Sequence, residues 1–373
     1  MRFTLSPDLT TLREDAYKAF LAAIPPDPPQ AGDLDTALAA PAREAEFPDG
    51  LLPMVHDLWE RPPEEGDDRL LRAVLTCEAA GMAASAFDVG QRFLLGWIAS
   101  RLPRWGTLLR EQPHLSSLSS TDAATRGELR RAGAHYQLHG RCRMLWPTGS
   151  EATRVLLFAQ HHGRVALVSA HLTGPRVRHF SRDTVQRGCR LVWAEFDFAE
   201  ITRTDVVPLN EATFSAHDLT CLGRVLTAAE ILGAMQWALD ASVRRARERK
   251  QFDQPIGGFQ AVAHRCADML CAVELCRSIV YAAAASQDGR GTPDTDLSSF
   301  ARLLLWQESL PVLTTALQLF GADGLRWSSD LHLQLRRGQV LRQLWETPCG
   351  VADEMTGYLA ASVQASGRQQ RRA

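Results

Sequence analysis

The residues whose types and spacing could do chemistry surround one short turn. The turn reads Arg249-Lys-Gln-Phe252-Asp-Gln-Pro255-Ile256-Gly-Gly-Phe259-Gln260. The guanidinium fork of an arginine can hold phosphate oxygens through paired, charge-assisted hydrogen bonds. This turn is therefore a candidate phosphate-binding corner, with Arg249 as its main cation.

A solvated helix end is the alternative interpretation of this region, because basic side chains near a helix C-terminus are favoured by the helix dipole. We expect this simpler role for the other members of the basic run, and phosphate binding for Arg249 alone. The residues assigned to a solvated helix end are Arg244, Arg245, Arg247 and Lys250.

Two long helices must position the turn. Apolar residues recur every three or four positions from Leu222 to Val243 and again from Phe259 to Val280, which places each set on one stripe of a helix. Two such stripes joined by a turn predict an antiparallel helix pair. Pro255 marks where the first helix has stopped and the second is about to begin.

The rest of the chain changes from helical to strand-like and back. Residues 70–84 and 87–102 have helical periodicity. Beyond residue 113, short runs of strand-forming residues separated by glycines predict an antiparallel sheet or barrel. From about residue 216 the pattern is helical again. The predicted strands are 135–139, 155–159, 164–169, 176–180 and 190–198.

This order of units, together with the motif R-x-x-F-x-x-P-I-x-x-F-Q, resembles the acyl-CoA dehydrogenase family. The resemblance implies an α+β fold that is mainly α. It places an N-terminal helical domain at residues 1–112, a middle β-barrel or sheet domain at 113–212 and a C-terminal four-helix bundle at 213–373. The resemblance covers nearly the whole chain, and its motifs are specific in the last third.

The resemblance implies the removal of hydrogen across the Cα and Cβ atoms of an acyl thioester. A base must take the α-proton, and a redox cofactor must accept hydride from the β-carbon because no side chain accepts hydride well. In this family the cofactor is FAD. The implied substrate is an acyl-CoA or an acyl group on a carrier protein, and the electron acceptor is left open.

The resemblance also assigns cofactor-binding roles to individual residues. Arg249 and Phe252 match positions that meet the adenine and pyrophosphate end of an FAD bound to a neighbouring subunit. Gln260 matches the glutamine that opens the second helix. Gln318 and Gly321 match the Q-x-x-G-G-x-G turn that approaches the same dinucleotide.

The implied catalytic base is Glu346, which follows that glycine turn by about one long helix. Other members place the base before an arginine at the start of the first bundle helix. Here Gly223 precedes Arg224, so Arg224 is retained as a candidate catalytic residue without a carboxylate beside it. On the flavin-ring side, Trp146 and Thr148 resemble the Trp and Thr that meet the ring, shifted along the strand.

Composition limits the other functions. The formal net charge is -2, and the basic residues are scattered, which argues against nucleic-acid binding. No apolar run approaches the roughly 18 uncharged residues of a membrane span, and the N-terminus lacks a signal-peptide core, so we expect a cytoplasmic protein. The eight cysteines contain no C-x-x-C pair, which predicts reduced thiols and no metal site.

Three function classes stay open. The first is an FAD-dependent acyl thioester dehydrogenase, a homodimer or homotetramer if Arg249 and Gln318 act across an interface. The second is a degenerate partner subunit that completes the FAD site of a heteromeric dehydrogenase. The third is the same scaffold reused for another flavin reaction or for a non-redox reaction, because family membership does not fix the reaction.

Overall fold

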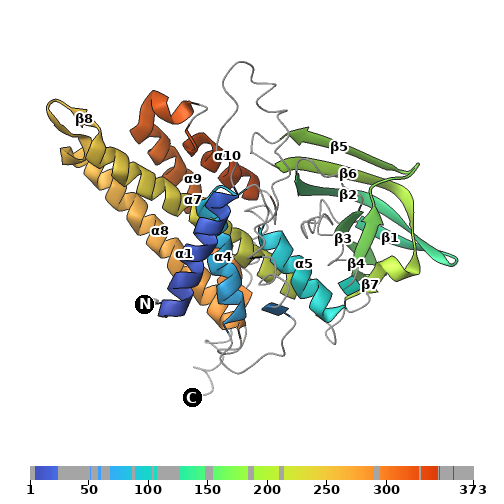
Figure 1. Cartoon of the computed structure of the whole chain (residues 1–373). Coiled ribbons are helices and arrows are strands. Elements are labelled where there is room, and N and C mark those ends of the chain that lie inside the picture. Colours follow the sequence, from blue (N-terminus) through green and yellow to red (C-terminus); the bar gives the residue numbers. More distant parts are fainter. Residues whose placement is uncertain are drawn as a thin grey trace, which may run out of the picture.

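The chain runs from helices into a sheet and back into helices (Figure 1). The computed structural model describes residues 5–23, 51, 58–59, 68–85, 89–102, 105–106, 127–147, 154–183, 189–209, 214–288, 295–326, 329–342, 344 and 356. The helices before the sheet are α1 (Pro7–Ala22), α4 (Arg69–Met82) and α5 (Val89–Arg101). The predicted α+β, mainly α fold is confirmed.

Seven strands form the sheet, in the order β5-β6-β2-β1-β3-β4-β7. They are β1 (Gly127–Ala132), β2 (His135–Pro147), β3 (Arg154–His161), β4 (Arg164–His171), β5 (Val177–Asp183), β6 (Cys189–Ile201) and β7 (Val206–Pro208). The five predicted strands are present, whereas β1 and β7 were not predicted. The predicted antiparallel pairing holds except between β1 and β3, which are parallel.

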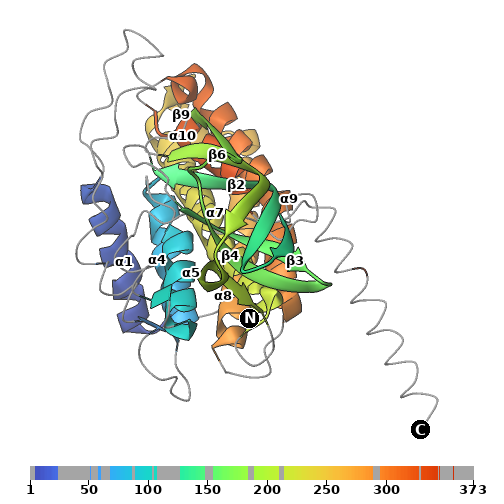
Figure 2. The ribbon, with the colours of Figure 1, turned by 90° about the vertical axis from the view of Figure 1, so that its right-hand side faces the viewer.

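The sheet buries apolar side chains on both of its faces. In β6, Val192, Ala194 and Phe196 alternate with more exposed residues and join a core of their own within the sheet, as a period of two requires. Leu156 and Phe158, by contrast, belong to the large core that the helices form. The sheet therefore packs on the helical body, and Figure 2 shows it lying in front of the bundle.

In the described part of the chain, the helices that follow the sheet are α7 (Ala216–Glu248), α8 (Gln260–Gln287), α9 (Thr295–Phe320) and α10 (Leu331–Leu341). A capping box starts α7, since the Ser215 hydroxyl accepts a hydrogen bond from the Asp218 N–H and the Asp218 carboxylate accepts one from the Ser215 N–H. The predicted antiparallel pair is α7 with α8.

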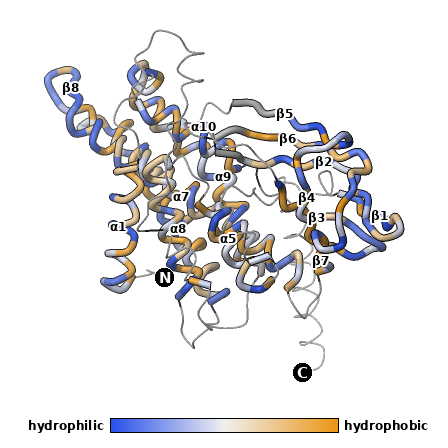
Figure 3. Tube along the Cα trace, turned by 45° about the vertical axis from the view of Figure 1, so that its right-hand side comes forward, coloured by the Kyte–Doolittle hydropathy of each residue, from blue (hydrophilic) through white to orange (hydrophobic). Residues whose placement is uncertain are grey.

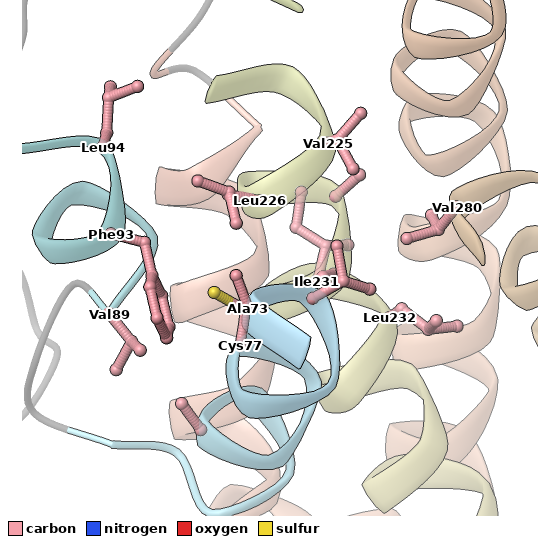
Figure 4. Packing of buried hydrophobic residues seen from close by; sticks show 14 of the residues in the cluster. Ala73, Cys77, Val89, Phe93, Leu94, Val225, Leu226, Ile231, Leu232 and Val280 are labelled. Carbon is pink, nitrogen blue, oxygen red and sulfur yellow. The ribbon is translucent and has the colours of Figure 1, made fainter. Parts of the chain in front are cut away.

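The apolar stripe predicted for α7 is buried, but it is not the only buried face of this helix. Every residue from position 219 to 235 is buried, because α4, α5, α8, α9 and α10 all pack on this helix. Figure 4 shows Val225, Leu226, Ile231 and Leu232 of α7 among neighbours from α4, α5 and α8. A helix that is apolar almost all round is the centre of a bundle.

Two glycines let α4 and α7 cross at very short distance. A Cβ atom on Gly81 would lie 2.0 Å from the carbonyl oxygen of Glu230, and one on Gly233 would lie 2.0 Å from that of Glu78. The helices that precede the sheet in the sequence and those that follow it thus share one core. The domain boundaries near residues 112 and 212 stay predictions.

The helix α8 is long and apolar enough to cross a membrane by length and composition alone, and 44% of its most apolar window is buried within the chain. Core helices of bundles meet the same criterion. Its inner residues Met269, Val273, Cys276 and Val280 join the helical core. Its outer face exposes Leu270 and Leu275, and this face needs a cover.

Candidate functional site

The candidate phosphate-binding corner is a small hairpin at the far tip of α7 and α8. After Arg249 ends α7, β8 (Lys250–Gln251) pairs with β9 (Gln254–Pro255), and a 3-10 turn at Ile256–Gly258 leads into α8. The Ile256 N–H donates to the Arg249 carbonyl at 2.8 Å, which fixes the corner. The tip is hydrophilic and lies at the opposite end of the molecule from the sheet (Figures 1 and 3).

Phe252 and Asp253 form the hairpin loop, and both have positive φ angles, 51° and 61°. A two-residue hairpin loop with both residues in the left-handed region is normally built from Asn and Gly, because a Cβ is disfavoured there. Phe252 is also 88% exposed, although its ring meets Phe259 edge-on at 6.1 Å. A strained aromatic held in solvent indicates a binding surface.

Packing of α7 against α9 brings a glycine turn beside Arg249. The turn is the 3-10 segment Gly321–Leu325. Its Asp323 carboxylate accepts from Arg245 at 2.6 Å and from Arg249 at 3.3 Å, and Arg326 lies 3.6 Å away. The hydrogen bond from Arg245, followed by the nearby arginine charges, holds the pKa of Asp323 below its ordinary value despite some desolvation.

The two glutamines of the predicted site lie on the flanks of this corner. Gln318, in the last turn of α9, accepts a hydrogen bond from Arg265 of α8 at 2.5 Å. Gln260 is the exposed first residue of α8. The structure therefore gathers the five residues predicted for the nucleotide end at one tip: Arg249, Phe252, Gln260, Gln318 and Gly321. Their cofactor contacts remain predictions.

Arg224 lies far from this tip. It is 1% exposed in the first half of α7, where it donates to the Ser299 hydroxyl of α9 at 2.7 Å. Arg224 and Arg249 are 25 positions apart, or about 38 Å along a helix. The structure does not bring the predicted catalytic arginine and the predicted phosphate-binding arginine of one chain together.

The structure describes only part of the residues predicted to contact the flavin ring or to act as the base. Trp146 pairs with Arg190 in the β2–β6 ladder, and its side chain lies outside the described residues. Thr148 and Glu346 also lie outside them. The strand β2, which carries Trp146, lies in the sheet at the opposite end of the molecule from the tip that carries Arg249 (Figure 1).

Arg245 was wrongly assigned to a solvated helix end. Its side chain is only 20% exposed, and it donates both to Asp323 and, at 3.3 Å, to the Phe320 carbonyl. Periodicity places Arg245 near the end of α7 but says nothing about which turn packs beside it. The one signal in the sequence was Asp323 itself, a carboxylate inside a glycine turn that follows a long helix.

Comparison with known proteins agrees with this arrangement. The family model "Acyl-CoA dehydrogenase, C-terminal domain" matches residues 218–344, which include the corner and the glycine turn. Residues 218–344 belong to this domain family. The acyl-CoA dehydrogenase FadE34 of Mycobacterium tuberculosis is 35% identical over 131 residues, covering 35% of this chain and 18% of that protein. The acyl-CoA dehydrogenase IpdE2 of Mycolicibacterium smegmatis is 33% identical over 124 residues, covering 33% of this chain and 38% of that protein.

The matched segment thus spans well under half of either relative, whereas the fold is shared over almost the whole chain. A solved acyl-CoA dehydrogenase from Slackia heliotrinireducens superposes with a TM-score of 0.78 at 17% identity, covering 98% of this chain and 99% of that one. The ChsE4–ChsE5 complex from M. tuberculosis gives 0.71 at 20% identity, with coverages of 96% and 99%. The chain therefore keeps the fold of these proteins beyond its matched segment.

The corner fits the diphosphate of the FAD that the family implies. Three arginines and one carboxylate leave a local charge of about +2, which matches a diphosphate diester with one charge on each phosphate. Gly321 has φ of 61°, and a Cβ added to it would meet nothing within 4 Å. The backbone at Gly321 is therefore open to a ligand, as phosphate-binding turns require.

Proposed function

We propose that this protein is an FAD-dependent dehydrogenase that acts on an acyl thioester, either an acyl-CoA or an acyl group on a carrier protein, in the cytoplasm. The observation that supports this most is the convergence of Arg249, Arg245 and the Gly321 turn beside the exposed ring of Phe252. The separate segments of the family motif meet there on a surface with the charge of a diphosphate-binding site.

FAD, when bound, accepts the hydride that no side chain can take. In this proposal the forks of Arg249 and Arg245 hold its diphosphate, and Phe252 offers a flat apolar surface to the adenine. Glu346 would take the α-proton of the thioester, and Trp146 and Thr148 would contact the flavin ring. Hydrogen bonds to the thioester oxygen stabilise the developing enolate charge.

The site is proposed to be shared between two chains. The nucleotide-end residues lie at the tip of α7 and α8, whereas Arg224 lies in the first half of α7 and β2 lies in the sheet at the opposite end of the molecule (Figure 1). One chain therefore cannot place both groups on one cofactor. A homodimer or homotetramer, with the tip of one protomer against the sheet side of another, resolves this separation.

The outer face of α8 supports such an assembly. A groove of about 650 Å³ runs between the outer halves of α7 and α8, and Leu239, Val243 and Leu270 line it. Beside it, Leu270 and Leu275 are 49% and 53% exposed. We assign this face to a second copy of the chain, because the tip that carries half of the site projects from the same two helices.

Thiol reactivity tests this assignment. Cys271 is exposed on the outer face of α8, so we expect iodoacetamide to alkylate it slowly in the assembled protein and at least tenfold faster in a Leu270→Glu variant that dissociates. Burial raises the pKa of both Cys142 and Cys276 to about 12, so these thiols stay protonated and unreactive in either state. Peptide mass spectrometry measures all three, and fast alkylation of Cys271 in the intact assembly would contradict the interface.

Absorbance of the purified protein tests the proposed function itself. A yellow homo-oligomer that loses its colour on addition of an acyl-CoA supports dehydrogenation. A protein that becomes yellow only when copurified with a homologous subunit instead indicates a partner subunit of a heteromeric dehydrogenase. A yellow protein that consumes oxygen with reduced flavin indicates another flavin reaction on this scaffold.

The Arg249→Ala variant should lower FAD occupancy about tenfold or more while shifting the melting temperature little. Arg249 has a 42% exposed side chain at a helix end, so its loss costs little folding energy but removes charge-assisted bonds to phosphate. Flavin absorbance per protein and thermal unfolding measure the two effects. Arg247→Ala removes the same charge from an exposed position that lines the α7–α8 groove, and equal occupancy in both variants would count against the assignment.

A further inference from the structure

Asp323 occupies the centre of the cationic corner, although a carboxylate repels phosphate. Its Oδ2 atom accepts from Arg245 at 2.6 Å and from Arg249 at 3.3 Å, while Arg326 lies 3.6 Å from Oδ1. The side chain is 36% exposed, so it faces the same solvent-accessible surface as the arginines. Any anion held by Arg249 will lie close to this carboxylate.

Arg245 also has contacts that do not involve Asp323. Arg245 also donates to the Phe320 carbonyl at 3.3 Å, and its guanidinium lies 5.1 Å from the centre of the Phe320 ring. Asp323 is ionised at neutral pH, since its arginine partners lower its pKa. Its main electrostatic effect at the corner is therefore to subtract one unit of charge.

The Asp323 carboxylate affects two kinds of diphosphate differently. A dinucleotide carries its diphosphate as an internal diester with one negative charge on each phosphate. A free nucleotide such as ADP ends in a monoester, and a phosphate monoester carries about -1.5 to -2 at pH 7. The nearby carboxylate repels this additional charge and so offsets part of its attraction to the arginines.

We propose that Asp323 is a specificity-determining residue that makes the corner select the internal diphosphate of a dinucleotide over nucleotides that end in a phosphate. The inference rests on the proposed function, because it concerns the same FAD-binding corner. It assigns a role to a residue that the family motif leaves unspecified, namely the exclusion of free ADP and ATP by a like charge.

Competition with bound FAD tests this role in the full-length protein. ADP-ribose and ADP share adenosine and a diphosphate, and they differ in whether the second phosphate is an internal diester or a terminal monoester. Displacement of FAD, followed by the rise in flavin fluorescence, gives the affinity of each competitor. In the Asp323→Asn variant we expect the affinity for ADP to rise about threefold to tenfold more than that for ADP-ribose.

The gain in ADP affinity relative to ADP-ribose affinity should shrink with added salt. These charges are solvent-accessible and are screened within about 10 Å at 0.1 M ionic strength. Glu128→Gln is the matched control. It removes the same charge from a carboxylate that is paired with Arg130 on β1, in the sheet at the opposite end of the molecule from the corner (Figure 1). Its ratio of ADP to ADP-ribose affinity should stay within about twofold of the original protein.

Two results would overturn the inference and are distinguishable from each other. If Asp323→Asn binds FAD but its preference for ADP-ribose is unchanged, or if both competitors weaken together, Asp323 only supports the fold of the corner. If the original protein binds neither FAD nor ADP-ribose, the proposed function fails as well. Thermal unfolding of each variant identifies a loss of binding that is due to misfolding.

Discussion

Replacing Gly233 by alanine is expected to lower the free energy of unfolding by about 3 kcal/mol. The added Cβ would lie 2.0 Å from the Glu78 carbonyl oxygen and 2.7 Å from the Met82 nitrogen. Both are backbone atoms of α4, so no rotamer change can relieve the clash. The two helices must separate instead, which opens space throughout the core that they share. Urea denaturation followed by circular dichroism measures the change.

Gly338→Ala provides the control. Gly338 also lies inside a buried helix, so alanine gains the same helix propensity of about 1 kcal/mol. There, however, the new Cβ would meet only the tip of the Leu313 side chain, at 2.8 Å, and that side chain can move. We expect its stability to stay within about 1 kcal/mol of the original protein. Equal stability of both variants would show that the α4–α7 crossing tolerates a wider spacing.

This crossing illustrates which parts of the fold could be predicted from the sequence. Periodicity located α4, α5, α7 and α8 to within a few residues, because each helix needs one apolar face whatever it packs against. It could not show that α7 is buried all round, since Gly81 and Gly233 look like ordinary weak helix formers. Their role depends on a contact between distant segments of the chain.

The strands show the same limit. The strands themselves could be located, because the side-chain period and the strand-forming residue types are local properties. The parallel pairing of β1 with β3 was not predicted. Gly127 pairs with Ala159, and the whole of β2 lies between these two residues in the sequence. No turn or periodicity marks such a pairing in the sequence.

The candidate site, too, could be predicted only in part from the sequence. The motif around Arg249 predicted a helix–turn–helix corner and grouped it with Gln318 and Gly321, and the structure places them together. The motif could not predict that Asp323 bridges Arg245 and Arg249, because that bridge depends on how α9 packs against α7. The charge of the corner is thus a tertiary property, although each residue that creates it is visible in the sequence.

A second large effect is expected at the ion pair between Glu230 of α7 and Arg337 of α10. Both side chains are almost fully buried, and the Arg337 guanidinium lies 2.5 Å from the Glu230 carboxylate. Arg337→Met should lower the free energy of unfolding by about 3–5 kcal/mol, because it leaves a buried carboxylate without its counter-charge. Arg336→Met, the same change at the half-buried neighbouring position on α10, should cost far less.

The double variant Glu230→Met/Arg337→Met should recover much of this loss, because replacing both charges by apolar groups removes the uncompensated charge. Recovery will be incomplete. The Glu230 carboxylate also accepts from the Gly90 N–H at the start of α5, at 2.7 Å, and losing that acceptor costs about 1–3 kcal/mol. A coupling energy above about 2 kcal/mol in the double-mutant cycle would confirm that the two residues act as a pair, whereas additive losses would contradict it.

The pH dependence of Arg337→Met provides an independent check. Burial raises the pKa of Glu230 above its ordinary value of 4.5, and the Arg337 charge opposes that rise in the original protein. Without Arg337 the folded state holds the Glu230 proton more tightly than the unfolded state does. Folding stability of the variant must then fall as pH rises above the unfolded pKa. The loss relative to the original protein should therefore be smaller at pH 5 than at pH 8, and a loss that is independent of pH would show that Glu230 never carries the unpaired charge.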